Sequence, residues 1–247
     1  MSIPKIIHQI WIQGYDNLPD DMKIKHCIIK QHNPNYQIIF WDNDNILHLL
    51  KKYNELYQFY QKIPSFTGNT KIYPSMSDVA RLVILYEYGG FYIDTDYYCP
   101  LSLDKIYNDD DEIVMVNTMY YIIKYIPIKI HSYLLGGKYG TLFMGMIKKH
   151  PMFKKLFPEL ILQTNRNKIG IFLDNFLQRN NYRVTIIDPK YVPSYTTCHT
   201  GICHTKKKST SYFGRDILIF VNCHIKLILL LILLLIIFTY IKINANK

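Results

Sequence analysis

The stretch that decides the fold reads Ser77-Asp78-Val79-Ala80-Arg81-Leu82-Val83-Ile84-Leu85-Tyr86-Glu87-Tyr88-Gly89-Gly90-Phe91-Tyr92-Ile93-Asp94-Thr95-Asp96. Its first part predicts a helix over Ser77–Tyr88 that the two glycines end, and its second part predicts a buried strand over Phe91–Asp96. Successive side chains of a strand point to opposite faces, so we expect Asp94 and Asp96 to point to the same face. Two carboxylates placed in this way can share a divalent cation, and oxygen ligands suit Mg²⁺ or Mn²⁺.

A second acidic residue pairs with an arginine on the helix before this strand. Asp78 and Arg81 are separated by one helical turn and therefore share a face. An acid and an arginine beside a metal site indicate a pocket for a nucleotide diphosphate. The simpler alternatives are a turn-forming Asp-x-Asp and a surface arginine that pairs with Glu87. The combination of both pairs at this spacing favours the functional interpretation.

These residues resemble one protein family. The pattern Ser-Asp-x-x-Arg, then Gly-Gly-x-Tyr-x-Asp-x-Asp, is similar to the core of the glycosyltransferases that include yeast-type α-mannosyltransferases and mannosylinositol phosphorylceramide synthases. The opening Ile3–Ile12, with the sequence IPKIIHQIWI, resembles the first strand of the family, and Asn33–Asp42 resembles its second. The resemblance covers about residues 3–104. It implies a GT-A type, Rossmann-like domain that binds a nucleotide-sugar, which we expect to span residues 1–210.

The resemblance also implies roles for individual residues. Asp96 binds the cation directly, whereas Asp94 binds the ribose of the donor and reaches the cation through water, with Mn²⁺ favoured over Mg²⁺. Arg81 reaches phosphate or sugar oxygens of the donor, and Asp78 contacts the sugar hydroxyls. Trp11 stacks on the nucleotide base, although a tryptophan on a strand is more commonly a core aromatic. We expect His8 to be a core histidine with its hydrogen bonds satisfied.

The resulting hypothesis is an α/β enzyme that moves a hexose from a UDP- or GDP-sugar to a hydroxyl of a glycan or lipid, with metal dependence and with retention at the anomeric carbon. One alternative is a catalytically degenerate protein that binds nucleotide-sugar or membrane without turnover. The net charge of +10 also raises a nucleic-acid-binding class, but no recognisable nucleic-acid-binding pattern accompanies it. The basic run Lys206–Lys208 is better suited to anionic lipid.

The remaining elements are expected to alternate between strands and helices, which indicates a layered α/β fold. Strands are predicted at residues 3–13, 36–41, 112–117, 120–130 and 183–187. Helices are predicted from Asp20 to about Gln31 and at residues 43–60, 142–149, 152–164 and 171–178, and residues 64–74 are predicted to form a loop.

The C-terminal segment 217–241 is predicted to be a membrane anchor, preceded by a juxtamembrane linker at residues 211–216 and followed by a short tail at 242–247. The apolar run Leu227–Ile241 alone would span only about 22 Å as a helix, short of the ~30 Å hydrocarbon core. The longer span contains Lys226, which would have to snorkel. The greater positive charge before the segment predicts a single pass with the catalytic domain in the cytosol. An amphitropic or buried tail is the alternative.

The C-terminal half departs from the family. Ser211–Gly214 stands where relatives close with Ser-Trp, and Lys168–Ile171 where many have Thr-Gly-Pro, so the sequence does not identify the acceptor. The loop Cys198–His204 has admissible zinc spacing but lacks a second ligand pair, so a histidine that makes an outer contact to the donor-bound metal is the better interpretation. Five scattered cysteines favour a reducing compartment.

Overall fold

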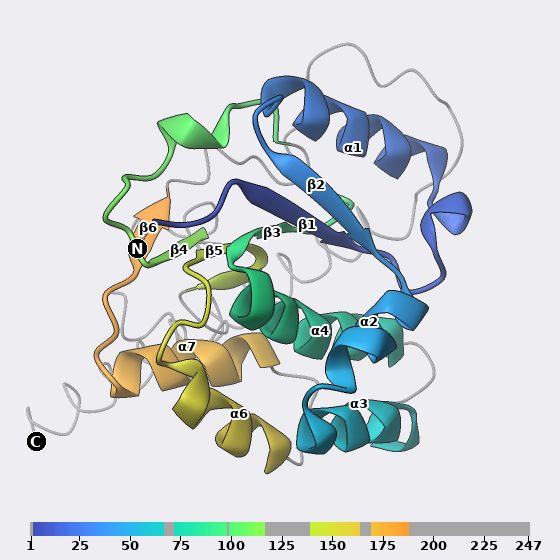
Figure 1. Cartoon of the computed structure of the whole chain (residues 1–247), viewed down its shortest axis with the longest axis vertical. Helices are drawn as coiled ribbons and strands as arrows, with labels where there is room; N and C mark the ends of the chain where they lie inside the picture. The colour runs from blue at the N-terminus through green and yellow to red at the C-terminus, as the bar shows by residue number, and fades with distance from the viewer. Residues whose placement is uncertain (1, 67–71, 98, 117–138, 164–168, 188–247) are drawn as a thin grey trace, which may run out of the picture. The chain divides into compact units, whose positions relative to one another are not determined.

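The computed structural model describes residues 2–66, 72–97, 99–116, 139–163 and 169–187 (Figure 1). All of these residues lie in one compact unit, Met1–Thr197. The predicted linker, anchor and tail, the Cys198–His204 loop and the predicted strand at 120–130 lie outside the described residues. Among the helices that the structure describes, none has the length and apolar character that a membrane crossing requires.

The described strands form one mixed sheet in the order β2-β1-β3-β5-β4-β6 (Figure 1). The strands are β1 (Ile6–Ile10), β2 (Gln37–Trp41), β3 (Gly90–Ile93), β4 (Ile113–Val116), β5 (Gly140–Met146) and β6 (Thr185–Ile187). β1 lies between β2 and β3 and is parallel to both, whereas β5 runs antiparallel between β3 and β4. The parallel half therefore contains the two strands of the predicted nucleotide site.

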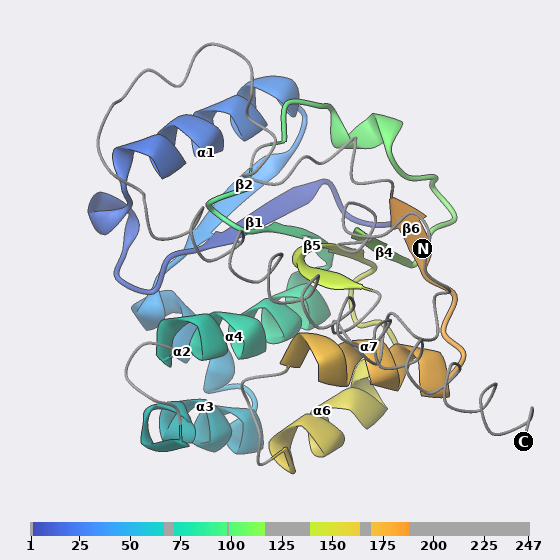
Figure 2. The ribbon, with the colours of Figure 1, turned by 180° about the vertical axis from the view of Figure 1, so that it is seen from behind.

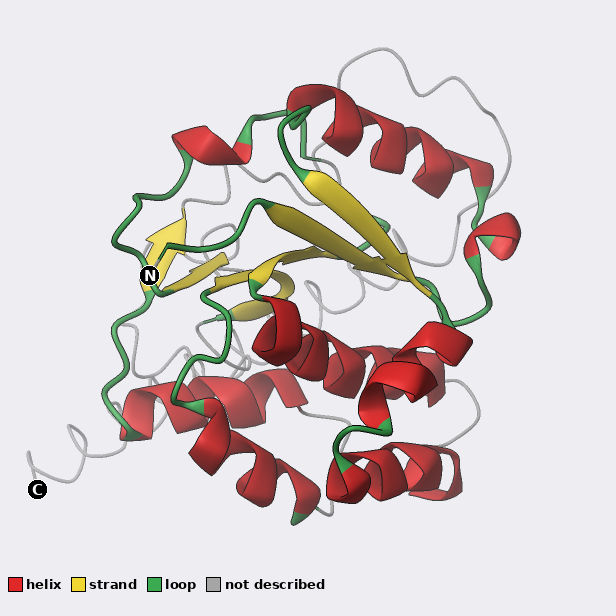
Figure 3. Ribbon diagram, viewed as in Figure 1, coloured by secondary structure: helices red, strands yellow, loops and turns green. Residues whose placement is uncertain are grey.

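Helices cover the two faces of the sheet unequally. The helices are α1 (Asp20–His32), α2 (Asn43–Leu50), α3 (Asn54–Phe66), α4 (Ile72–Tyr88), α6 (Phe153–Ile161) and α7 (Ile169–Arg179), with short 3₁₀ turns at Tyr15–Asn17 and Leu103–Lys105. In Figures 1 and 2, α1 lies on one face and α2, α3, α4, α6 and α7 lie on the other. Figure 3 shows the same layers by type of structure, with the sheet between the helices.

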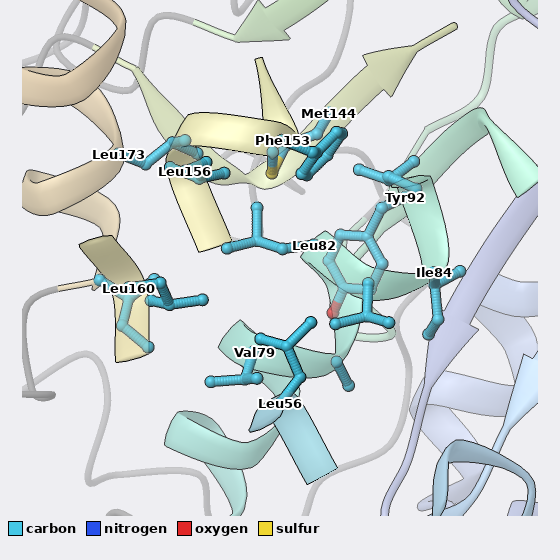
Figure 4. Packing of buried hydrophobic residues seen from close by; sticks show 14 of the residues in the cluster. Leu56, Val79, Leu82, Ile84, Tyr92, Met144, Phe153, Leu156, Leu160 and Leu173 are labelled. Carbon is cyan, nitrogen blue, oxygen red and sulfur yellow. The ribbon is translucent and has the colours of Figure 1, made fainter. Parts of the chain in front are cut away.

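α4 is the central helix of the larger core. Val79, Leu82 and Ile84 are fully buried and pack with residues of α3, α6 and β5 in one apolar cluster (Figure 4). A separate cluster on the α1 face includes Ile7 and Ile29. Because α4 contacts β1, β3 and β5, burial of its apolar side fixes the polar residues that it also carries against the middle of the sheet.

Two glycines connect α4 to β3 with little space around them. Gly89 and Gly90 have φ angles of +67° and +91°, which side-chain-bearing residues rarely adopt. A Cβ atom on Gly90 would lie 2.5 Å from the carbonyl oxygen of Ile6. The structural role predicted for these glycines is confirmed, since they let β3 enter the sheet directly beside β1.

His8 is a core histidine, as predicted. Its Nδ1 accepts a hydrogen bond from Nε1 of Trp41 at 3.1 Å, and its Nε2 lies 2.9 Å from the carbonyl oxygen of Gly89. An indole N–H only donates and a carbonyl only accepts, so His8 is neutral with its proton on Nε2. Burial lowers the pKa of His8 to about 4, although the Gly89 contact acts to raise it. His8 thus joins β1, β2 and the end of α4.

Most predicted elements are found close to their predicted bounds, but residues 142–149 are not a helix. They overlap β5, which fills the space between β3 and β4. Leu and Met favour helices locally, yet this segment is buried between two strands and has no alternating polar side to reveal it. Gly145 also fits the contact with β3, since a Cβ there would lie 2.4 Å from the ring of Phe91.

Three boundaries also differ from the prediction. The single helix expected at 43–60 is two helices, α2 and α3, separated at residues 51–53. The expected loop at 64–74 is shorter, because α3 continues through Pro64 to Phe66 and α4 begins at Ile72. β3 ends at Ile93, so the aspartate pair follows the strand.

Candidate active site

The parallel strands place the predicted site residues at one edge of the sheet. The chain leaves β1 for β2 on one side and later returns to β3 on the other side of β1. Such a reversal opens a crevice outside the carboxyl ends of the strands, which is where α/β folds bind ligands. Trp11 directly follows β1 and Asp94 directly follows β3. The fold therefore places Trp11 and the aspartate pair at the same ligand-binding edge.

The aspartate pair lies on a turn rather than on the strand. The amide of Asp94 donates to the carbonyl of Leu142 in β5 at 2.9 Å, and the amide of Tyr97 donates back to the carbonyl of Asp94 at 3.0 Å. The prediction that the strand continues to Asp96 is therefore wrong, because β3 ends at Ile93 and the pair follows it on this turn. The side chain of Asp96 is exposed, whereas that of Asp94 is only 18% exposed.

Arg81 connects the helix, the turn and the sheet. Its Nη2 lies 3.1 Å from Oδ1 of Asp78 and 3.4 Å from Oδ1 of Asp94. Nη1 donates to the carbonyl of Thr141 at the start of β5, and Nε donates to the carbonyl of Ser77 at 3.2 Å. The Arg81 side chain is 6% exposed. The predicted face shared by Asp78 and Arg81 is confirmed, and contact with a donor stays a prediction.

The alternative pairing of Arg81 with Glu87 is not what the structure shows. Glu87 lies near the other end of α4, where its carboxylate binds Lys52 at 3.1 Å and also Lys149. Arg81 and Glu87 thus belong to separate clusters.

Tyr92 is a site residue that sequence reasoning missed. Its hydroxyl donates to Oδ1 of Asp94, and its ring lies 4.4 Å from the guanidinium carbon of Arg81. This contact is a cation–π interaction, and the hydrogen bond orients the carboxylate. The available signal was the spacing of Tyr92 and Asp94, since neighbours two apart at a strand end share a face.

The carboxylates of the site have too little positive charge around them. Burial raises the pKa of Asp94 to about 6, and the charge of Asp96 adds to this effect, although Arg81 and the Tyr92 hydroxyl act to lower it. Burial likewise raises the pKa of Asp78, against the lowering effect of Arg81. A bound cation would stabilise the ionised carboxylates, so this donor set fits a divalent metal.

The number of available ligands fits the same conclusion. Within the described part of the chain, no three His, Cys, Asp or Glu side chains gather closely enough to hold a metal alone. Mg²⁺ is usually held by one or two carboxylates together with substrate phosphates. Asp94 and Asp96 could supply that protein share, and a diphosphate and water would then fill the remaining positions.

Trp11 follows β1 at this edge of the sheet, with a fixed backbone and a partly exposed side chain. Its amide donates to the carbonyl of Trp41 at 2.9 Å, and its carbonyl accepts from the amide of Gly14 at 2.9 Å, so the backbone is fixed. The side chain is partly exposed, and its Nε1 is buried without a hydrogen-bond partner among the described residues. Stacking on a base stays a prediction.

An α/β sheet with a carboxylate turn at its carboxyl edge and an acid–arginine pair beside it fits a glycosyltransferase. Residues 20–113 match the family described as "Glycosyltransferase sugar-binding region containing DXD motif". Over these residues the chain is similar to this family.

Two similar proteins carry glycosyltransferase names. The chain is 28% identical over 253 residues to the uncharacterized glycosyltransferase L373 of Acanthamoeba polyphaga mimivirus, covering 89% of this chain and 91% of that protein. It is 31% identical over 109 residues to inositol phosphoceramide mannosyltransferase 1 of Schizosaccharomyces pombe, covering 42% of this chain and 31% of that protein. The chain thus matches nearly all of the viral protein but about a third of the yeast one.

A solved structure supports the fold. The PaToxG glycosyltransferase is similar with a TM-score of 0.52 at 15% identity, over 72% of this chain and 69% of that one. The likeness fits the predicted GT-A type.

Proposed function

We propose that the protein transfers a hexose from a UDP- or GDP-sugar to a hydroxyl acceptor and requires Mn²⁺ or Mg²⁺. The observation that carries this proposal is the turn at Asp94–Asp96, whose partly buried carboxylate has a raised pKa and lies beside Arg81 at the carboxyl edge of the sheet. A site with surplus negative charge at that edge suits a cation bridged to a diphosphate.

Each residue of the site has a task in this proposal. Asp96, whose side chain is exposed, binds the cation directly, and Asp94 binds the ribose and reaches the cation through water. Arg81 holds Asp78 and Asp94 in position. Asp78 binds hydroxyls of the sugar, and Trp11 stacks on the base.

The chemistry is a group transfer at the anomeric carbon. The bond from this carbon to the diphosphate oxygen breaks, and a bond to the acceptor oxygen forms with retention of configuration. The leaving phosphate takes the proton of the acceptor hydroxyl, so a nucleoside diphosphate and a glycoside result. The cation, when bound, offsets the negative charge that develops on the diphosphate.

A lipid or glycan acceptor is part of the proposal. The support is the match to an inositol phosphoceramide mannosyltransferase and the apolar sequence at 217–241, which we propose as a membrane anchor with the catalytic domain in the cytosol. Protease treatment of sealed vesicles tests the topology. Digestion of the catalytic domain from outside is expected, and its protection would overturn the cytosolic placement.

The activity is tested by measuring hydrolysis of UDP- and GDP-sugars with Mn²⁺. We expect Asp96→Asn to reduce turnover by at least about 100-fold, the scale seen when a group that stabilises transition-state charge is removed. Asp110→Asn is the matched control, because Asp110 is a surface aspartate with a side chain that is 70% exposed and pairs with Arg183. Equal rates for wild type and Asp96→Asn would contradict the proposal.

The second candidate is a degenerate protein that binds nucleotide-sugar without turnover. The departures in the C-terminal half favour it, since Ser211–Gly214 lacks the tryptophan of relatives. This candidate predicts that UDP or GDP with Mn²⁺ raises the melting temperature by mass action while no sugar is released.

A further inference from the structure

We propose that Lys25 of α1 is a positioning residue for the turn that carries Asp96. Nζ of Lys25 donates a hydrogen bond to the carbonyl oxygen of Asp96 at 3.0 Å, across 71 positions of sequence. The contact joins the helix on the far face of the sheet to the second aspartate of the pair.

Because Lys25 is buried, this hydrogen bond matters more than one made by an exposed lysine. The Lys25 side chain is 7% exposed, and an ammonium group is costly to bury unless polar partners compensate it. Nζ also forms an ion pair with Asp21 at 3.9 Å. Lys23 on the same helix is 34% exposed and lies 3.7 Å from Asp20. Its ammonium stays near the surface, whereas that of Lys25 reaches the turn.

Together with the Lys25 contact, three hydrogen bonds fix the turn. β5 accepts the amide of Asp94 through the carbonyl of Leu142, the amide of Tyr97 closes the turn, and α1 binds the carbonyl of Asp96. The peptide of Asp96 is therefore fixed, although its carboxylate is exposed. An exposed ligand on a fixed backbone loses little freedom on binding a cation, so it binds more tightly.

The consequence for metal binding rests on the proposed function. Outer groups that orient a metal ligand typically change metal affinity by 10- to 100-fold when they are removed. We expect Lys25→Met to weaken Mn²⁺ binding by roughly 10- to 100-fold in the presence of UDP or GDP. Lys25→Arg is expected to recover part of this loss, because its guanidinium can still donate to the carbonyl.

The test uses the full chain and two readouts. Electron paramagnetic resonance titration with Mn²⁺ and UDP, then GDP, gives the affinity of wild type, Lys25→Met, Lys25→Arg and the matched control Lys23→Met. Hydrogen–deuterium exchange of the metal-free protein follows the peptide that contains Asp94–Tyr97. We expect faster exchange there in Lys25→Met, with the other strands unchanged, and no change in Lys23→Met.

The two proposals fail in different ways. If wild type binds no Mn²⁺ with either nucleotide, the proposed function fails, while faster exchange at the turn in Lys25→Met still supports the positioning role. If Lys25→Met matches wild type in affinity and exchange, the positioning role is overturned. If neither Lys25 variant folds, it is also overturned, because Lys25 then supports the whole fold rather than the turn.

Discussion

α4 carries two charged clusters, and their electrostatics are opposite. We call them the Arg81 cluster, made of Asp78, Arg81, Tyr92 and Asp94, and the Glu87 cluster, made of Lys52, Tyr53, Glu87 and Lys149. In the Arg81 cluster, burial raises the pKa values of both carboxyl groups. In the Glu87 cluster, burial acts to raise the pKa of Glu87, but hydrogen bonds from Lys149, Tyr53 and Lys52 lower it to about 2.

The difference distinguishes the Arg81 cluster, a candidate binding site, from the Glu87 cluster, whose ion pairs stabilise the fold. The Glu87 cluster has two lysines for one carboxylate and needs no further cation. The Arg81 cluster has one arginine for two carboxylates, with Asp96 close enough to raise the pKa of Asp94 further. A ligand with positive charge would complete its balance, in line with the proposed function. We therefore take the surplus of negative charge, rather than the presence of ion pairs, as the mark of the candidate site.

The largest effect is expected from Arg81→Met. Removal of the buried guanidinium leaves two partly buried carboxylates without compensation, which costs about 3 to 5 kcal/mol of unfolding free energy. Urea denaturation of the metal-free protein measures this loss. Arg179→Met is the matched control, since Arg179 is 63% exposed, pairs with Glu159 and lies over the ring of Phe176 at 6.0 Å. A loss as small as that of the control would show that Arg81 does not hold the site together.

The second test concerns His8, whose Nε2 contacts the carbonyl oxygen of Gly89 directly after α4. The pKa of His8 is about 4 in the folded protein, against 6.5 for an unperturbed histidine, so the unfolded chain binds the proton more tightly. The contribution of neutral His8 to the free energy of unfolding is complete above pH 6.5. It is lost as the pH falls toward 4, and the loss amounts to at most about 3 kcal/mol. Stability measured across this range should therefore decrease with acidity.

Two variants isolate the contribution of His8. In His8→Asn the decrease between pH 6.5 and 4 should be smaller, at lower overall stability, because Asn does not titrate. His32→Asn changes an exposed histidine of α1 and should retain the dependence of wild type. If both variants keep the full slope, His8 does not cause it.

A smaller effect is expected in the Glu87 cluster. Glu87→Gln removes the carboxylate that both lysines bind, and we expect it to lower the free energy of unfolding by about 1 to 2 kcal/mol. The loss is limited because solvent screens the half-exposed lysine side chains. Thermal unfolding measures the loss, and sugar-nucleotide hydrolysis should remain at the wild-type rate. Loss of hydrolysis with unchanged stability would reverse the roles assigned to the two clusters.

The smallest effect is expected from Tyr53→Phe. The variant removes one hydroxyl that donates to Glu87, and Lys52 and Lys149 still compensate the carboxylate, so the loss should be about 0.5 to 1 kcal/mol. Tyr73→Phe, at a tyrosine that is 50% exposed, controls for the loss of a hydroxyl. A loss above about 2 kcal/mol would mean that the hydroxyl, rather than the lysines, holds Glu87.

The predictable part of the site was local in sequence. The helical spacing of Asp78 and Arg81, and the short connection through Gly89 and Gly90, were enough to bring that pair near Asp94. The turn after Ile93 was missed in part because one of its two hydrogen bonds, from the amide of Asp94, goes to the backbone of β5 at Leu142. The Lys25 contact was missed because nothing local relates a lysine on α1 to a carbonyl 71 residues later.

Contacts with distant parts of the chain also explain the main error in the predicted fold. Residues 142–149 contain good helix formers and lack polar alternation, so their local preference favours a helix. Their conformation is decided by pairing with β3 and β4, which lie elsewhere in the chain. Tertiary pairing overrides propensity most readily in a central strand that is buried on both sides.

The site is attached to β5 through main-chain atoms. Arg81 binds the carbonyl of Thr141, and Asp94 binds the carbonyl of Leu142. Every amino acid supplies that acceptor, so replacement of these two side chains by others that fit a strand leaves both bonds in place. Mutational drift can therefore change the side chains that β5 presents beside the candidate site without breaking the bonds that hold Arg81 and Asp94 to the sheet.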